Sequence, residues 1–279
     1  MSRGDDTGRR RGRVTGTIRA AGRALHVDHR PGAAGRVPLV LCSGIGTSST
    51  LFDALVDRLD PDRPLVLFDA PGIGRSPRPI VPYRMPALAC ALRGVVDRLG
   101  YRRADVLGVS WGGGLAQQYA VQNPRHCRRV VLTATATGTL MVPAAPRVLL
   151  RMATPRRHRD PEYARSIAGE IYGGSARTAG PRVADLLHRE PRATSVLPYL
   201  FQLAAMAGWT SLPFLPLLRQ PTLVMVGDDD PIIPEVNGRI MQRLLPRGRL
   251  HRYRGGHLAV LSEAAELAPV IDRFLDGPD

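Results

Sequence analysis

Residues 104–112 read ADVLGVSWG, and this stretch decides the expected fold because an apolar run leads directly into a Gly-x-Ser-x-Gly motif. The run predicts a buried strand, and apolar residues at helical spacing up to Ala120 predict a helix behind it. Ser110 then lies on a sharp strand-to-helix turn, a nucleophile elbow, which presents its hydroxyl at the end of the sheet. Gly108 and Gly112 allow strand and helix to pass closely. Because the motif also occurs by chance, a turn without chemistry remains the alternative at this point.

Strand and helix patterns alternate along most of the chain. Predicted strands cover 14–19, 24–28, 37–42, 65–68, 104–109, 129–134, 222–226 and 249–253, and predicted helices cover 51–59, 85–99, 235–245 and 262–275. This alternation predicts an α/β fold with a mostly parallel central sheet flanked by helices. Residues 138–219 show no β pattern, but many prolines and short helical patterns at 161–172 and 196–207. We expect this insertion, after the strand near 129–134, to form a mainly helical cap over the carboxyl edge of the sheet.

Length, charge and cysteine usage restrict the class of protein. The 279 residues suffice for one domain with a substantial core, expected over 14–279, whereas 1–13 are mostly Gly, Arg and Asp and predict a disordered tail. The net charge is +15, and all 39 basic residues are arginines. Because most of these arginines are scattered along the chain, we expect them to lie on solvated faces and not to form a nucleic-acid site. Three cysteines without paired spacing, no apolar segment after the N-terminal arginines and no run of about 20 apolar residues predict a reduced, cytoplasmic protein without a membrane span.

The serine of the elbow requires partners, because a hydroxyl is a weak nucleophile that needs a histidine base held by a carboxylate. After such an elbow the partners follow in the order Ser, acid, His. Of the seven histidines, only His251 and His257 come after the last strand that ends in carboxylates. His251 lies inside a strand pattern, whereas His257 follows two glycines in a loop that can reach the elbow. We therefore predict Ser110 as nucleophile and His257 as base.

The acid is expected where a predicted strand ends in Gly-Asp-Asp-Asp-Pro, residues 227–231. Three adjacent carboxylates cannot all be buried cheaply, so we expect two of them to be solvated. Asp230 is the predicted triad acid because residues 227–234 match the pattern G-x-x-D-x-x-x-P, which is common in chains with this elbow. Asp229 is the alternative.

Acyl transfer also creates an oxyanion, which backbone N–H groups fixed in advance must receive. The predicted donors are Trp111, the residue after the nucleophile, and Ile45, in the loop Ser-Gly-Ile-Gly at 43–46 that follows a predicted strand. A plain glycine-rich turn is the alternative for this loop. The predicted chemistry requires neither a metal ion nor an organic cofactor.

Short motifs along the chain resemble the intracellular medium-chain-length poly(3-hydroxyalkanoate) depolymerases of the α/β-hydrolase superfamily. They are GIG at 44–46, FDAPG at 68–72, GVSWGG at 108–113, IYGG at 171–174, GWTS at 208–211, GDDDP at 227–231 and GHL at 256–258. The resemblance implies an α/β-hydrolase fold and a serine hydrolase that cleaves the ester bonds of stored polyester through an acyl-enzyme, releasing 3-hydroxy acids or oligomers. It implies the same triad of Ser110, Asp230 and His257. The Arg/Gly-rich tail and Ser43, where asparagine is more usual, depart from the family.

The predicted cap carries apolar side chains suited to an aliphatic substrate or to a granule surface. Tyr199, Met206 and Trp209 are the predicted substrate-binding residues, with packing inside the cap as the alternative. The expected partners are a polyester granule or a small ester, at a cytoplasmic location. The same triad would also serve a small-molecule carboxylesterase, a lipase or a cofactor-free haloperoxidase. A basic protein that binds granules or nucleic acid is the alternative of a different class.

Overall fold

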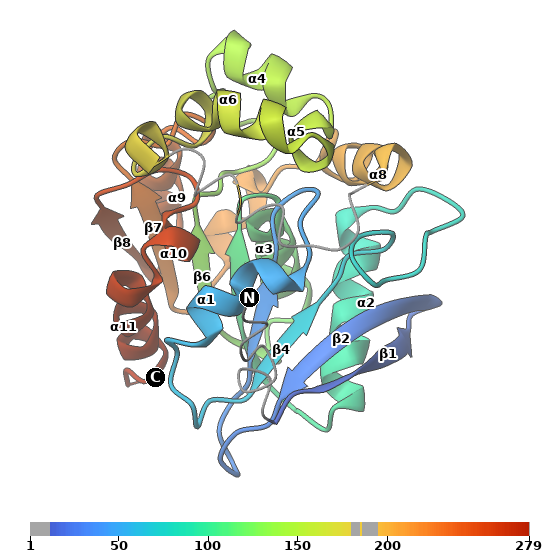
Figure 1. The fold of residues 1–279 in the computed structure, drawn as a ribbon. Coiled ribbons are helices and arrows are strands. Elements are labelled where there is room, and N and C mark those ends of the chain that lie inside the picture. Colours follow the sequence, from blue (N-terminus) through green and yellow to red (C-terminus); the bar gives the residue numbers. More distant parts are fainter. Residues whose placement is uncertain (1–11, 180–184, 186–194, 279) are drawn as a thin grey trace, which may run out of the picture.

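An eight-stranded sheet organises the computed structural model, which describes residues 12–179, 185 and 195–278 (Figure 1). The strands are β1 Val14–Ala20, β2 Arg23–Arg30, β3 Leu39–Cys42, β4 Leu65–Phe68, β5 Ala104–Val109, β6 Cys127–Thr133, β7 Thr222–Gly227 and β8 Gly248–Tyr253. Their order in the sheet is β1-β2-β4-β3-β5-β6-β7-β8. β2 pairs antiparallel with β1 and with β4, whereas the pairs from β4 to β8 are parallel. The predicted mostly parallel sheet is confirmed, while the predicted tail lies, up to residue 11, outside the described residues.

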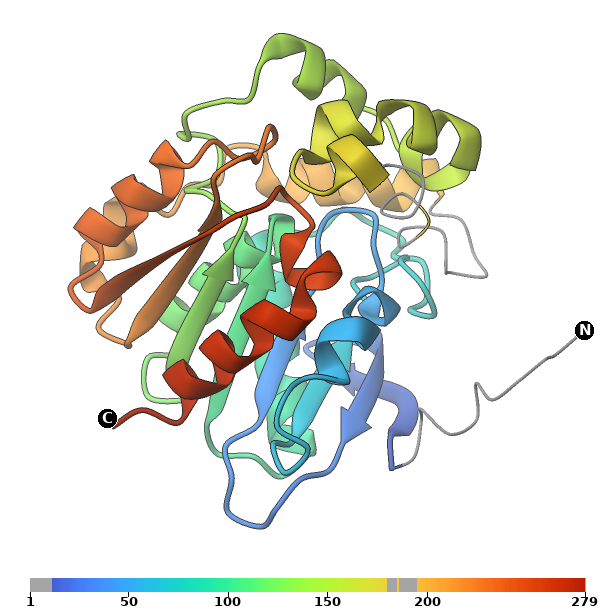
Figure 2. The ribbon, with the colours of Figure 1, turned by 60° about the vertical axis from the view of Figure 1, so that its left-hand side comes forward.

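Helices cover both faces of the sheet. They are η1 Ser49–Phe52, α1 Asp53–Val56, α2 Met85–Arg98, α3 Trp111–Gln122, α9 Val236–Leu244, α10 Ala259–Ser262 and α11 Ala264–Leu275. The buried side chains of α1, α10 and α11 belong to one apolar cluster, and those of α2, α3 and α9 belong to a second cluster. Figure 2 shows α1 and α11 in front of the sheet. The predicted helix over 51–59 is shorter, since Ser48 caps η1 by accepting from Thr50 N and the following α1 has four residues.

β5 shows why the central strands are apolar runs. Leu107 and Val109 pack in the first cluster, while Ala104 and Val106 pack in the second. Successive side chains of a strand point to opposite faces, so a sheet with helices on both faces buries every position. Asp105 is the charged exception, and both of its carboxylate oxygens accept hydrogen bonds from Arg128. The strand therefore reaches the elbow without exposing a side chain.

The described helices between β6 and β7 leave the two helical layers. They include α4 Pro146–Met152, α5 Arg156–Arg159, α6 Pro161–Tyr172, α8 Val196–Met206 and η2 Leu212–Leu217. Of these, α4, α5 and α6 lie over the carboxyl ends of the strands in both ribbon views (Figures 1 and 2). A β-bridge between Gly138 and Thr210 joins the beginning of this segment to its end. We use the term cap segment for residues 138–219. Among all described helices, none combines the length and the apolar character needed to cross a bilayer.

Candidate active site

Ser110 forms the turn between β5 and α3 with a backbone φ of 55° and ψ of −121°, which is a strained conformation for a residue with a side chain. The turn is held by hydrogen bonds on both sides, from Ser110 N to Thr133 O at 3.0 Å and from Gly113 N to Ser110 O at 2.9 Å. A Cβ atom at Gly108 would overlap backbone atoms of Gly112 and Gly113. The glycines before and after the serine are therefore required by close backbone contact, as the sequence predicted.

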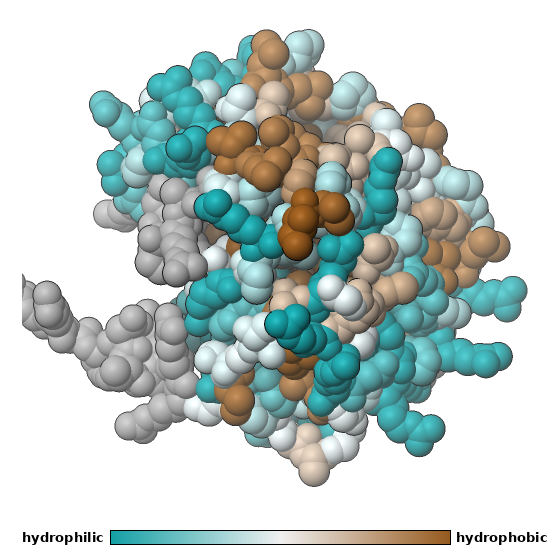
Figure 3. All heavy atoms as spheres, turned by 90° about the vertical axis from the view of Figure 1, so that its right-hand side faces the viewer, coloured by the Kyte–Doolittle hydropathy of each residue, from teal (hydrophilic) through white to brown (hydrophobic). Residues whose placement is uncertain are grey.

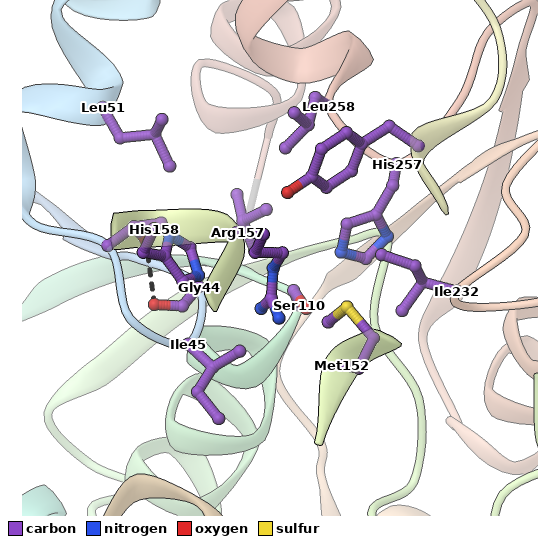
Figure 4. Close-up of a pocket in the computed structure, with 13 residues that line it drawn as sticks. Gly44, Ile45, Leu51, Ser110, Met152, Arg157, His158, Ile232, His257 and Leu258 are labelled. Atoms are coloured by element: carbon purple, nitrogen blue, oxygen red, sulfur yellow. Dashed lines mark hydrogen bonds between the residues drawn. The ribbon is translucent and has the colours of Figure 1, made fainter. Parts of the chain in front are cut away.

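His257 lies in the loop after β8, with its ring directed toward Ser110 (Figure 4). Its Nδ1 atom is 2.8 Å from Asp230 Oδ2, and the two side chains are 5% and 1% exposed. The other carboxylate oxygen of Asp230 accepts from the N–H groups of Ile232 and Ile233, both at 2.9 Å. Because Nδ1 carries the hydrogen donated to the carboxylate, Nε2 is left as a proton acceptor toward the serine side.

The three adjacent aspartates have separate partners. Asp228 accepts from Gly255 N at 3.0 Å. Asp229 accepts two hydrogen bonds of 2.6 Å from Arg177, which hold the pKa of its carboxyl below the usual value, and one from Gly174 N at 2.7 Å. Both of these partners of Asp229 belong to the cap segment. Asp230, and not Asp229, therefore contacts the His257 ring.

The loop after β3 lies beside the elbow. Thr47 bonds to Gly44 O through its N–H at 3.3 Å and its hydroxyl at 2.9 Å, which closes the loop tightly. A Cβ atom at Gly44 would lie only 3.7 Å from Ser110 Cβ. Trp111 is the first residue of α3, so its N–H has no partner within the helix and lies at the positive end of the helix dipole. Ile45 and Trp111, the predicted oxyanion donors, thus flank the serine.

A buried carboxylate network fixes the position of this loop. Asp69 accepts from Ser49 N at 2.8 Å and from Arg75 N at 2.9 Å, which ties the loop after β3 to the loop after β4. Asp28 bonds to the Arg75 side chain at 3.0 Å and to His26 Nε2 at 3.1 Å. Burial alone would raise the pKa of Asp28, but the His26 hydrogen bond and the Arg75 charge outweigh it and lower the pKa. The carboxylates of Asp28 and Asp69 therefore stabilise the loop after β3 through hydrogen bonds and an ion pair.

A pocket of about 350 Å³ opens over Ser110 (Figure 4). From the sheet side it is lined by Gly44, Ile45, Thr47, Leu51, Val109, Ser110, Ile232, His257 and Leu258, and from the cap segment by Met152, Arg157, His158 and Tyr172. Nucleophile, base and one predicted oxyanion donor therefore share one cavity, which the cap segment covers. Within the described residues no group of three or more His, Cys, Asp or Glu side chains is placed to hold a metal ion.

Comparisons with known proteins agree with this geometry. Residues 37–264 match the model of the alpha/beta hydrolase fold family. The chain belongs to this family. It is 41% identical over 93% of its length to a poly(3-hydroxyalkanoate) depolymerase of Ectopseudomonas oleovorans, of which it covers 91%. It is 27% identical over 90% of its length to a 2-hydroxy-6-oxononadienedioate/2-hydroxy-6-oxononatrienedioate hydrolase of a Pseudomonas species, of which it covers 92%.

Solved structures give the same fold for this α/β hydrolase. The enol-lactonase from Burkholderia xenovorans LB400 superposes with a TM-score of 0.80 at 22% identity, with 94% of this chain and 100% of the lactonase covered. This level of identity establishes the arrangement of strands and helices. The predicted α/β-hydrolase fold is confirmed.

The three predicted substrate-binding residues of this α/β hydrolase do not line the pocket over Ser110. Tyr199 is fully buried, and its hydroxyl donates to Met152 O at 2.6 Å. The Trp209 indole donates to Gln118 at 2.7 Å, and Met206 and Trp209 both lie against Gly114 of α3. These side chains pack between the cap segment and α3, and their binding role stays a prediction.

Other pocket residues were not expected from the sequence. Arg157 and Met152 occupy a part of the cap segment whose pattern carries no chemical motif. Tyr172 offered a signal, because it belongs to the IYGG motif that supports the family resemblance. That motif ends α6 at Gly173, whose φ of 61° turns the chain toward the loop of His257. This turn brings Tyr172 to the loop of the base, where its carbonyl accepts from His257 N at 2.7 Å.

Proposed function

We propose that this α/β hydrolase is a cytoplasmic poly(3-hydroxyalkanoate) depolymerase that hydrolyses the ester bonds of stored medium-chain polyester. The observation that carries the proposal is the 41% identity to a depolymerase over 93% of the chain, which includes the cap segment. The fold alone would not select this substrate, because one fold supports many activities. An apolar side of the pocket, formed by Leu51, Met152, Ile232 and Leu258, suits an aliphatic side chain.

The proposed mechanism uses two acyl transfers. Ser110 Oγ attacks the ester carbonyl while His257 Nε2 takes its proton, and Asp230 stabilises the imidazolium that forms. The N–H groups of Ile45 and Trp111 receive the oxyanion. The imidazolium then gives its proton to the leaving 3-hydroxyl oxygen as the C–O bond breaks. Water, deprotonated by His257, releases the acyl group from the serine as a carboxylic acid.

Hydrolysis of different esters tests the proposal. Suspensions of medium-chain polyester, suspensions of short-chain polyester and soluble p-nitrophenyl esters are supplied to the wild-type enzyme. Release of 3-hydroxy acids is measured for the polyesters, and release of p-nitrophenol is measured for the soluble esters. We expect hydrolysis of the medium-chain polyester. If the soluble esters are cleaved and every polyester is left intact, the protein is a small-molecule esterase and the depolymerase assignment is wrong.

Single substitutions test the mechanism. Ser110→Ala and His257→Ala should each lower kcat by about 10⁶-fold, the loss typical of a serine–histidine pair that acts as a unit. Ser166→Ala, at an exposed serine of α6, is the matched control and should retain full activity. Activity close to wild type in either the Ser110 or the His257 variant would exclude the proposed chemistry.

We also propose that the enzyme works at the surface of polyester granules, which it contacts through an apolar patch beside the cap segment. Figure 3 shows this face, on which hydrophobic residues gather in the upper half. The patch consists of Ile80, Val81, Val196, Leu197 and Leu200, which are between 44% and 98% exposed. Three of these residues belong to α8, and Ile80 and Val81 belong to the loop that precedes α2. This loop is joined to the end of α8 by a hydrogen bond that Arg84 donates to Ala207 O at 3.0 Å. Exposed apolar side chains gathered on one face are a common feature of surfaces that bind an apolar partner.

The double variant Ile80→Ser/Leu197→Ser tests the patch. The rate on polyester suspension, divided by the rate on a soluble ester, should fall by about tenfold, equivalent to about 1.4 kcal/mol of lost apolar contact. Leu217→Ser is the matched control, since Leu217 is 68% exposed and lies outside the patch. An equal effect of the control, or an unchanged ratio in the double variant, would remove the patch from the proposal.

A further inference from the structure

Arg157 of α5 is a buried cation in the wall of the pocket. Arg157 is only 2% exposed, yet it lines the same cavity as Ser110 and His257. Its Nη1 donates to Tyr199 OH at 3.0 Å and to Thr154 O at 3.5 Å, both uncharged acceptors. Among the described residues no carboxylate lies within ion-pair distance of it. A buried charge without a counter-charge is costly, so this position is poised to receive an anion.

Tyr172 supplies a second donor in the same wall. The residue is 3% exposed, and within the described residues its hydroxyl makes no hydrogen bond of regular geometry, although the Arg157 guanidinium lies close enough to interact with it. Burial raises the pKa of this phenol to about 12, while the charge of Arg157 and its hydrogen bond to the phenol act in the opposite direction. The hydroxyl therefore stays protonated at neutral pH and can donate. A ligand that accepts a well-aligned hydrogen bond from this buried hydroxyl would therefore be favoured in the pocket.

We propose that Arg157 and Tyr172 bind the free carboxylate end of the polyester and thereby place the last ester bond of the chain over Ser110. The planar guanidinium matches a carboxylate in shape and charge, and the phenol can donate to the same group. In a 3-hydroxyalkanoate chain, one oxygen, one CH and one CH₂ separate the terminal carboxylate from the last ester carbonyl. The two groups are therefore close together in the substrate, as Arg157, Tyr172 and Ser110 are in the lining of one pocket. This inference rests on the proposed depolymerase function.

Binding of the acid end determines what is released. The bond that breaks joins the carbonyl of the penultimate unit to the 3-oxygen of the last unit, and water supplies the hydroxyl to the carbonyl and the proton to that oxygen. One 3-hydroxy acid leaves, and the shortened chain ends in a new carboxylate. Each turnover thus regenerates the group that Arg157 recognises, so the enzyme removes single units from the acid end.

Arg157 also has a structural contact, since it lies over the Tyr199 ring at 5.6 Å and links α5 to α8. A structural role alone would affect all esters equally. The proposed role instead distinguishes an oligomer with a free carboxylate from the same oligomer capped as a methyl ester, because capping removes the charge and leaves the scissile bond unchanged.

The experiment compares a 3-hydroxyalkanoate trimer with its methyl ester. For the wild-type enzyme we expect kcat/KM to be at least about tenfold higher on the free acid, with monomer as the first product by mass spectrometry. Arg157→Met should bring this ratio close to one, Arg157→Lys should retain part of it, and Tyr172→Phe should lower it. Arg156→Met, at the exposed neighbouring arginine, is the matched control and should keep the wild-type ratio.

Several outcomes would overturn the inference. An equal kcat/KM for acid and methyl ester in the wild-type enzyme excludes carboxylate recognition even if no Arg157 variant folds. A ratio that Arg157→Met leaves at the wild-type value excludes this residue. In both cases the trimer is still cleaved, so the proposed function stands. Failure to cleave any trimer, with p-nitrophenyl esters still hydrolysed, overturns the depolymerase assignment itself.

Discussion

Replacing Asp230 by asparagine should disable the base without removing it. The N–H groups of Ile232 and Ile233 both point at one oxygen of Asp230, so the amide carbonyl of the asparagine must stay in that position. The amide NH₂ then faces His257 Nδ1, where the carboxylate oxygen stood at 2.8 Å. Nδ1 is forced to accept, which moves the ring hydrogen to Nε2, and the histidine can no longer take a proton from Ser110. A wrong tautomer of this kind costs about 10⁴-fold in kcat in a serine protease, equivalent to about 5 kcal/mol.

Asp229→Asn is the matched control for this prediction. Asp229 pairs with Arg177, whose side chain is 53% exposed, and an exposed pair contributes about 0–1 kcal/mol to stability. The asparagine keeps an acceptor for Gly174 N. We therefore expect kcat within about threefold of wild type and a change in unfolding free energy of about 1 kcal/mol or less.

The assay measures kcat with a soluble ester and the melting temperature by circular dichroism for both variants. Loss of activity in Asp230→Asn with the fold retained is the expected result. The tautomer argument would be refuted by an Asp230→Asn enzyme that keeps more than about 1% of wild-type kcat, or by an Asp229→Asn enzyme that loses as much as its neighbour.

Three further predictions concern the frame around the site. Gly112→Ala should lower the unfolding free energy by about 3 kcal/mol, measured by urea titration, because its Cβ would overlap the Cys42 carbonyl; an unchanged midpoint would contradict the close contact. Asp28→Asn should cost about 2 kcal/mol at pH 7 and progressively less as pH falls from 3.8 through the lowered pKa of Asp28, because its neighbours stabilise the ionised carboxylate and this stabilisation is lost on protonation; a loss in melting temperature that does not change between pH 7 and this acidic range would contradict the prediction. Gln202→Leu removes the acceptor of Gly46 N at 2.7 Å and should lower kcat by about tenfold with little change in KM, whereas an effect confined to KM would place its role in substrate binding.

The elements of the sheet could be predicted because their signals are local. The strand 104–109 is an apolar run that ends in glycine and serine, and the same holds for the strand before the loop of Ile45. The choice between Asp229 and Asp230 was harder, since both follow the same strand. The contact that separates them comes from Arg177 in the cap segment, 52 residues earlier in the chain. A single sequence does not reveal such a pair.

The cap segment was the least predictable part for the same reason. Aromatic and apolar residues on α8 do not indicate which face of the helix is covered: Tyr199 is fully buried, while Leu197 and Leu200 on the same helix are exposed. Arg157, one of many arginines in the sequence, is buried only because α5 and α8 close around it. Burial of this kind depends on tertiary contacts and leaves no pattern in the chain.

The backbone of Tyr172 has a mechanical consequence for the enzyme. Its carbonyl accepts the N–H of His257 at 2.7 Å, and a Cβ atom at Gly256 would overlap the same carbonyl. The end of α6 is thus fixed to the loop of His257 by a hydrogen bond and by close backbone packing. Displacing this corner of the cap segment would move the His257 imidazole away from Ser110. The end of α6 therefore couples the position of the cap segment to the alignment of the catalytic base, and the cap segment cannot open at this corner without loss of that alignment.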